Sequence, residues 1–217
     1  MTKKSFLRNV VAIAICLAGV TMFSSCSNDD KDNGSNNNGG TPSTGVYKVK
    51  TANITYDLVE NGILTRTETV MWDDYGKLYR IGDAETASIV DEKAGKGWSL
   101  DHREKTYIEY SATFYEMALA GRNAFKYKDN PNMPGYQKLP NRTIAGKECT
   151  VYSTAVEGIT KVHGSWNEIP FLKEETGVLV VGEHSITLNE TYTATSYSET
   201  VPANSFKVPS DYTLRPQ

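Results

Sequence analysis

The stretch ITLNETYTATSY, residues 186–197, alternates between two kinds of side chain with a period of two. Ile186, Leu188, Tyr192 and Ala194 share one parity, and threonines occupy positions 187, 191, 193 and 195 on the other. A strand of this kind buries one face and exposes the other, which is typical of an antiparallel sheet. The pattern therefore favours a mainly β domain over a parallel α/β fold.

Shorter strands are expected on both sides of this stretch. Asn61-Gly62 is the favoured two-residue hairpin turn, and Asn167-Glu168 lies between two further apolar runs. We expect about ten strands, at residues 46–60, 63–72, 78–81, 88–90, 98–101, 106–110, 148–155, 161–166, 169–172 and 186–197. No helical pattern separates the first six, so they form a meander.

One helix is expected after the meander. Thr113 and Glu116 have the spacing of a capping box. An apolar stripe follows at helical spacing: Phe114, Met117, Ala118, Gly121 and Phe125. Residues 126–141 contain three prolines and no periodicity, which indicates a long loop that is either functional or a simple crossover.

The N-terminus has the order of an export signal. Lys3, Lys4 and Arg8 precede an apolar run at residues 10–23, which is shorter than the roughly 20 residues that a membrane-spanning helix needs. We expect residues 1–25 to be a signal peptide that is cleaved between Ser25 and Cys26. The alternative is an uncleaved membrane anchor.

The segment Phe23-Ser24-Ser25-Cys26 resembles the lipobox of bacterial lipoproteins. This resemblance implies that the Cys26 thiol carries a diacylglyceryl group and anchors the chain without a transmembrane helix. Ser27, where some lipoproteins have a retention-signal aspartate, implies the outer membrane. The tract Ser27, Asn28, Asp29 and Asp30 resembles an acidic signal for export to the cell surface. The alternatives are a plain secretory signal and a tract that is only a spacer.

Residues 26–44 contain almost nothing that a core could bury, so we expect a lipidated cysteine followed by a disordered tether. Such a linker has a root-mean-square reach of about 23 Å. Residues 45–217 are of the usual size for one domain. The chain has a net charge of −3 and no basic cluster, so nucleic acid is not an expected partner.

No catalytic or metal-binding pattern stands out in the sequence. His102, His163 and His184 lie outside metal-ligand spacing, and Asp101-His102 falls in an expected turn. With Cys16 in the signal and Cys26 lipidated, Cys149 is expected to be a buried, unpaired thiol. We therefore expect no metal, no cofactor and no enzymatic activity.

The C-terminal part of the chain resembles the lipoprotein-carrier (LolA/LolB-like) half-barrels in two places. One is VPANSFKVP, residues 201–209, followed by Tyr212. The other is IAGKEC, residues 144–149, followed by WNEIPFL, residues 166–172. The resemblance implies a strongly bent antiparallel sheet, or open half-barrel, whose apolar concave side is covered by the helix.

The resemblance, together with the abundance of aromatic residues, leads to two hypotheses about function. In the first, the β domain binds a lipid or another apolar ligand in a pocket lined by Trp98, Phe114, Met117 and Trp166. In the second, it has no ligand cavity and is a cell-surface interaction module that contacts a protein or glycan. The oligomeric state does not follow from the sequence.

Overall fold

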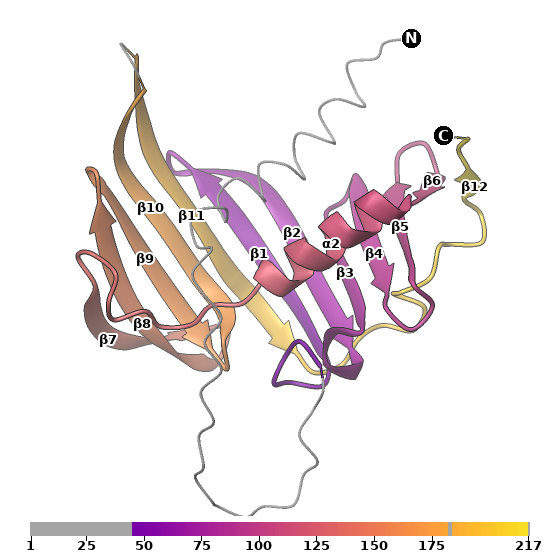
Figure 1. Ribbon diagram of the computed structural model, residues 1–217, viewed down its shortest axis with the longest axis horizontal. Helices are drawn as coiled ribbons and strands as arrows, with labels where there is room; N and C mark the ends of the chain where they lie inside the picture. The colour runs from indigo at the N-terminus through magenta and orange to yellow at the C-terminus, as the bar shows by residue number, and fades with distance from the viewer. Residues whose placement is uncertain (1–44, 182–183, 217) are drawn as a thin grey trace, which may run out of the picture. The chain divides into compact units, whose positions relative to one another are not determined.

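The computed structural model describes residues 45–181 and 184–216, which belong to one compact unit, Thr44–Gln217. The expected signal and anchor residues Ser25, Cys26, Ser27, Asn28, Asp29 and Asp30 lie outside the described residues. The described part contains twelve strands, a short 3-10 helix and one α-helix (Figure 1). Their bounds are β1 Ala52–Glu60, β2 Ile63–Asp73, η1 Asp74–Gly76, β3 Leu78–Gly82, β4 Thr86–Asp91, β5 Lys96–Asp101, β6 Thr106–Glu109, α2 Ala112–Ala124, β7 Gln137–Ile144, β8 Lys147–Val156, β9 Ile159–Trp166, β10 Ile169–Val181, β11 His184–Ser198 and β12 Thr213–Leu214.

All twelve strands form one open sheet in the order β12-β6-β5-β4-β3-β2-β1-β11-β10-β9-β8-β7. Every pair is antiparallel except β12 with β6, which is parallel. The expected mainly β, half-barrel fold with one main helix on the concave side is confirmed. Both residues of the Asn61-Gly62 turn have positive φ angles, as the favoured hairpin turn requires.

Two strands have no counterpart among those expected from the sequence. β7 contains Pro140, which cannot donate a hydrogen bond to a neighbouring strand. The structure accommodates Pro140 because β7 is an edge strand and its register with β8 shifts between Leu139 and Arg142. β12 is only two residues long and lies at the other edge.

The helix begins earlier than the sequence suggests and packs through a different face. Ser111 is its N-cap residue and makes no side-chain capping bond, so Thr113 lies within the first turn. Tyr115, Ala118, Leu119 and Phe125 pack against the core, whereas Phe114 and Met117 are exposed. Apolar residues surround this helix on several sides, so periodicity alone does not identify the buried face. No helix in the described part of the chain is long and apolar enough to cross a membrane.

Both faces of the sheet are covered over β4 and β5. On the concave side, α2 lies across β1 to β5 (Figure 1). We call this side the helical face. On the other side, Phe206, Val208 and Tyr212 from the C-terminal segment pack against a buried cluster of Ala87, Ile89 and Leu100. The strands β7 to β11 extend beyond the helix.

Candidate functional site

The helical face is a packed core wherever α2 covers it. Tyr47 stacks on Trp72 with ring centroids 4.2 Å apart, and both side chains are buried. Phe125, at the C-terminal end of α2, meets the buried Tyr56 edge to face at 5.9 Å. Large aromatic rings therefore fill the space between the helix and the sheet.

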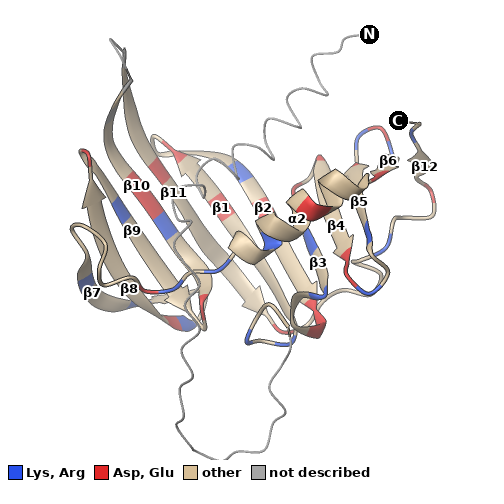
Figure 2. Ribbon diagram, in the orientation of Figure 1, with Lys and Arg blue, Asp and Glu red and all other residues tan. Residues whose placement is uncertain are grey.

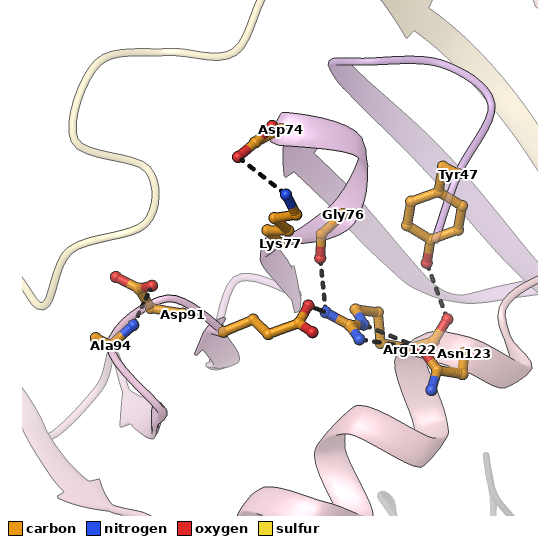
Figure 3. Close-up of polar contacts among 9 residues, drawn as sticks. Tyr47, Asp74, Gly76, Lys77, Asp91, Ala94, Arg122 and Asn123 are labelled. Atoms are coloured by element: carbon orange, nitrogen blue, oxygen red, sulfur yellow. Dashed lines mark hydrogen bonds and ion pairs between the residues drawn. The ribbon is translucent and has the colours of Figure 1, made fainter. Parts of the chain in front are cut away.

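A buried arginine fixes the end of the helix (Figure 3). The Arg122 side chain is 3% exposed, and its guanidinium donates to the Gly76 carbonyl oxygen at 2.8 Å and to Glu92 Oε2 at 2.7 Å. The Tyr47 hydroxyl donates to the Arg122 carbonyl oxygen at 2.9 Å. Gly76 has a φ of 95°, and a Cβ there would lie 2.7 Å from the Tyr47 ring, so only glycine fits this turn.

Beyond the helix, the strands β9 to β11 contain both basic and acidic residues (Figure 2). Residues directly opposite each other on paired strands lie on one face. Tyr192 on β11 stacks on Tyr56 at 4.4 Å, which places it on the helical face. Tyr192 is paired with Lys173 on β10, and Lys173 with His163 on β9. We call Arg66, Glu68, Lys161, Lys173 and Glu175 the charged belt.

Glu175 is the centre of one half of the belt. Its carboxylate lies 3.1 Å from Lys173 Nζ and 3.3 Å from Lys161 Nζ, and the Glu175 side chain is only 15% exposed. Burial alone raises the pKa of Glu175, but Lys173 and Lys161 outweigh burial and hold the pKa below its usual value. Glu175 is thus a carboxylate at neutral pH, flanked by two ammonium groups.

Glu68 is the centre of the other half. Its carboxylate accepts a hydrogen bond from the Tyr192 hydroxyl at 2.9 Å and lies 3.3 Å from Arg66. Burial raises the pKa of Glu68, and Arg66 and Tyr192 offset this only in part. A buried carboxyl group with a raised pKa is a common mark of a functional site, although structural networks produce it as well.

An aromatic strap borders the belt. The strap, residues 126–136, lies over β8 and β9 through two tyrosine rings. Tyr127 stacks on His163 at 4.4 Å, and Tyr136 stacks on Tyr152 at 5.4 Å. Burial, followed by Lys173, lowers the pKa of His163 to about 4. His163 is therefore neutral at physiological pH, and its stacked ring makes one wall beside the belt.

On the other side of the belt, the helical face becomes apolar. On the same parity, Tyr192 is followed by Glu190, then Leu188 and Ile186 on β11, and Lys161 is followed by Ile159 on β9. Ile159 is paired with Val156 on β8. We call Val156, Ile159, Ile186 and Leu188 the apolar rim. Ile186 is 49% exposed and Val156 is 41% exposed.

The four residues expected to line one pocket do not come together. Phe114 and Met117 are on the exposed side of α2. Trp98 is paired with Ile89 and packs with the C-terminal segment. Its neighbour Gly97 faces Tyr110 on the helical face. Because successive residues of a strand point to opposite faces, Trp98 lies on the face opposite the helix. Trp166 contacts Phe171 and Tyr197 near the β9–β10 turn. Aromatic character indicated burial at Trp98 and Trp166 but not the face on which each ring lies.

The charged belt and apolar rim were missed by the sequence reasoning. Lys161, His163, Lys173 and Glu175 alternate along two strands that flank the Asn167-Glu168 turn. That turn fixes which residues of the two strands lie opposite each other. The alternation of charged residues on both strands was therefore the one sequence pattern that indicated a charged cluster on one face. The remaining reactive groups lie apart from the belt: Cys149 is buried, and burial raises its pKa to about 11. No metal-binding cluster of His, Cys, Asp or Glu occurs in the described part of the chain.

No protein-family model matches this chain, and no curated protein matches it. Several solved structures resemble it distantly. An uncharacterized conserved protein from Thermus thermophilus is 8% identical, with a TM-score of 0.44 over 77% of this chain and 91% of that chain. MucB in complex with MucA(peri) is 12% identical, with a TM-score of 0.40 over 75% of this chain and 55% of that chain.

A LolA superfamily protein from Nitrosomonas europaea is 10% identical, with a TM-score of 0.17 over 74% of this chain and 91% of that chain. Similarity at this level identifies neither a family nor a function for the chain.

Proposed function

We propose that this chain is an outer-membrane lipoprotein, displayed at the cell surface, whose β domain binds a lipid or another amphiphile. The observation that carries the proposal is the charged belt next to the exposed apolar rim on the part of the helical face beyond α2. An amphiphile has a polar head next to an apolar tail, which matches the position of the charged belt next to the apolar rim. The helix itself covers a packed core, so the ligand lies beside it and not beneath it.

The belt suits a polar head that carries both donors and acceptors. Lys161 and Lys173 supply ammonium donors, and Glu175 supplies carboxylate oxygens. The partly exposed Lys173 side chain has 38% of its surface open to solvent, which leaves donors for a ligand. The apolar rim contributes the hydrophobic term, about 0.8 kcal/mol for each methylene group that it removes from water.

The membrane location rests on the N-terminal sequence. Acylated Cys26 would hold the protein firmly, because each buried methylene of the acyl chains adds about 0.8 kcal/mol. In this proposal Asp29 and Asp30 direct the protein to the cell surface. We propose a binding role without catalysis; the buried Cys149 thiol, whose pKa is raised to about 11, is poorly suited to act as a nucleophile.

Two variants of one hairpin test the ligand site. Ile186→Asp places a carboxylate in the apolar rim, whereas Val180→Asp places one on the opposite face of the same hairpin. The Ile186 side chain is 49% exposed and the Val180 side chain is 66% exposed, so both variants should fold. We expect Ile186→Asp to weaken binding of a fluorescent fatty acid at least tenfold and Val180→Asp to leave it unchanged. Equal effects of the two variants would place the ligand elsewhere.

The anchor is tested separately. Cys26→Ala should abolish metabolic labelling with a fatty acid, and labelling that persists in this variant would contradict the assignment. Replacing Asp29 and Asp30 with alanine should preserve labelling but protect the domain from protease added to whole cells. Unchanged protease accessibility would show that the acidic residues are only a spacer.

A surface interaction module is the second candidate, and the helix supplies the observation that favours it. Phe114 is 46% exposed and Met117 is 41% exposed on the outer side of α2. Exposed large apolar side chains on one helix face are a usual component of protein interfaces. Under this alternative, Met117→Glu should abolish partner binding, and Ile186→Asp should not.

A further inference from the structure

The C-terminal segment, residues 199–216, crosses the face of the sheet opposite the helix. In Figure 1 it leaves the lower end of β11 and reaches β12 beside β6. Phe206, Val208 and Tyr212 cover the apolar cluster of β4 and β5. Besides the β12–β6 pairing and the Lys105–Asp211 ion pair, two side-chain contacts attach it to the sheet, one made by Arg80 and the other by His102.

His102 lies in the β5–β6 turn between a cation and the C-terminal segment. Its Nδ1 atom is 2.7 Å from the Tyr212 hydroxyl, and its Nε2 atom is 3.4 Å from the Arg80 guanidinium. The same guanidinium donates to the Ser205 carbonyl oxygen at 3.0 Å. Arg80 and His102 thus hold the segment at two points.

This geometry requires a neutral imidazole. A guanidinium can only donate, so Nε2 of His102 must accept with its lone pair. Nδ1 then carries the proton and donates to the Tyr212 oxygen. A second proton on the ring would sit on Nε2, directed at Arg80. It would remove the acceptor and bring two cations within hydrogen-bond distance of each other.

We propose that His102 is a pH-sensitive latch, which holds the C-terminal segment on the sheet when neutral and releases it when protonated. Release would uncover the apolar surface formed by Trp98, Ile89 and Leu100. The proposal does not depend on the ligand site, which lies on the other face.

The surrounding charges set the direction of the pH dependence. Burial, followed by Arg80, lowers the pKa of His102, and Asp83 and Asp101 offset this in part, leaving the pKa below its usual value of about 6.5. Two ion pairs lie close by, Arg103 with Glu85 at 2.6 Å and Lys105 with Asp211 at 2.8 Å, and Glu104 belongs to the same turn.

Because the released state takes up a proton more readily than the latched state, the latch is complete above about pH 6.5 and weakens as the pH falls below it. Each unit by which the latched pKa is lowered permits at most a tenfold increase in the released fraction.

Hydrogen exchange measured by mass spectrometry on the full chain tests the latch. Wild type, His102→Gln and His102→Arg are compared with one another at pH 7.5 and again at pH 5.0, so that the intrinsic pH dependence of exchange cancels. Glutamine can accept from Arg80 and donate to Tyr212 without titrating, and arginine is permanently charged. Peptides from β1 report whether each variant is folded.

At pH 7.5 we expect wild type and His102→Gln to protect residues 205–214 equally, and His102→Arg to exchange there at least fivefold faster. At pH 5.0 the wild type should move toward His102→Arg, while His102→Gln stays protected. The latch is overturned if the wild type follows His102→Gln at both pH values. It is equally overturned if His102→Arg, with β1 still protected, retains full protection of the segment.

Discussion

Arg122→Met isolates the energetic contribution of the buried arginine. Methionine keeps an unbranched apolar stem but removes every donor from a site where the arginine side chain is 3% exposed. The buried Gly76 carbonyl then loses a charged donor, which costs about 1.5–3 kcal/mol. The Glu92 side chain is 44% exposed, so loss of that ion pair adds less than about 1 kcal/mol. The expected decrease in unfolding free energy is therefore about 1.5–4 kcal/mol.

Urea denaturation followed by circular dichroism measures this decrease directly. For a domain of this size it corresponds to a fall in melting temperature of about 3–16 °C. Glu92→Gln is the matched control, because it removes the exposed partner and keeps the Gly76 bond. We expect it to cost less than about 1 kcal/mol. Equal losses in the two variants would show that the ion pair, and not the buried carbonyl, provides the stabilisation.

Two further predictions concern the packing and the charge of the helical face. Leu119→Ala should lower the unfolding free energy, measured by urea denaturation, by about 2–4 kcal/mol because Leu119 packs against the core. Met117→Ala should lower it by less than about 1 kcal/mol because Met117 is exposed. Equal losses would contradict the assigned helix face. Glu68→Gln should stabilise the protein at pH 7.5 but not at pH 4. The reason is that the raised pKa of Glu68 makes its ionised form unfavourable in the folded state, so the wild type loses stability relative to the variant as the pH rises from 4 to 7.5. An equal difference in unfolding free energy between the two proteins at both pH values would refute this.

The strands could be predicted because their signal is local. Asn61-Gly62 and Asn167-Glu168 set two hairpins, and alternation on β1 and β11 identified the buried parity that Tyr56 and Ala194 occupy. β7 could not be predicted in the same way. This edge strand, which contains Pro140, pairs with a single neighbour in a shifted register. Neither feature can be deduced from the residues of β7 alone.

The candidate site could not be predicted because it depends on which strands become neighbours. Lys161 and Glu175 are close since β9 pairs with β10, but Glu68 and Tyr192 meet only because β1 brings β2 and β11 together. Met117 was assigned to a buried stripe because the helix has apolar residues on more than one side. The side of the helix that packs on the sheet instead carries Tyr115, Leu119 and the buried Arg122.

The most direct test of the proposed ligand site is photo-crosslinking in the native membrane. Cells expressing the full chain are fed a diazirine-bearing fatty acid and irradiated, and the labelled peptides are identified by mass spectrometry. Label incorporated at Cys26 through acylation serves as an internal control. The proposed site predicts crosslinks in peptides that contain Val156, Ile159, Ile186 and Leu188, and their loss in Ile186→Asp. Label confined to Cys26, or crosslinks only along the outer side of α2, would contradict it.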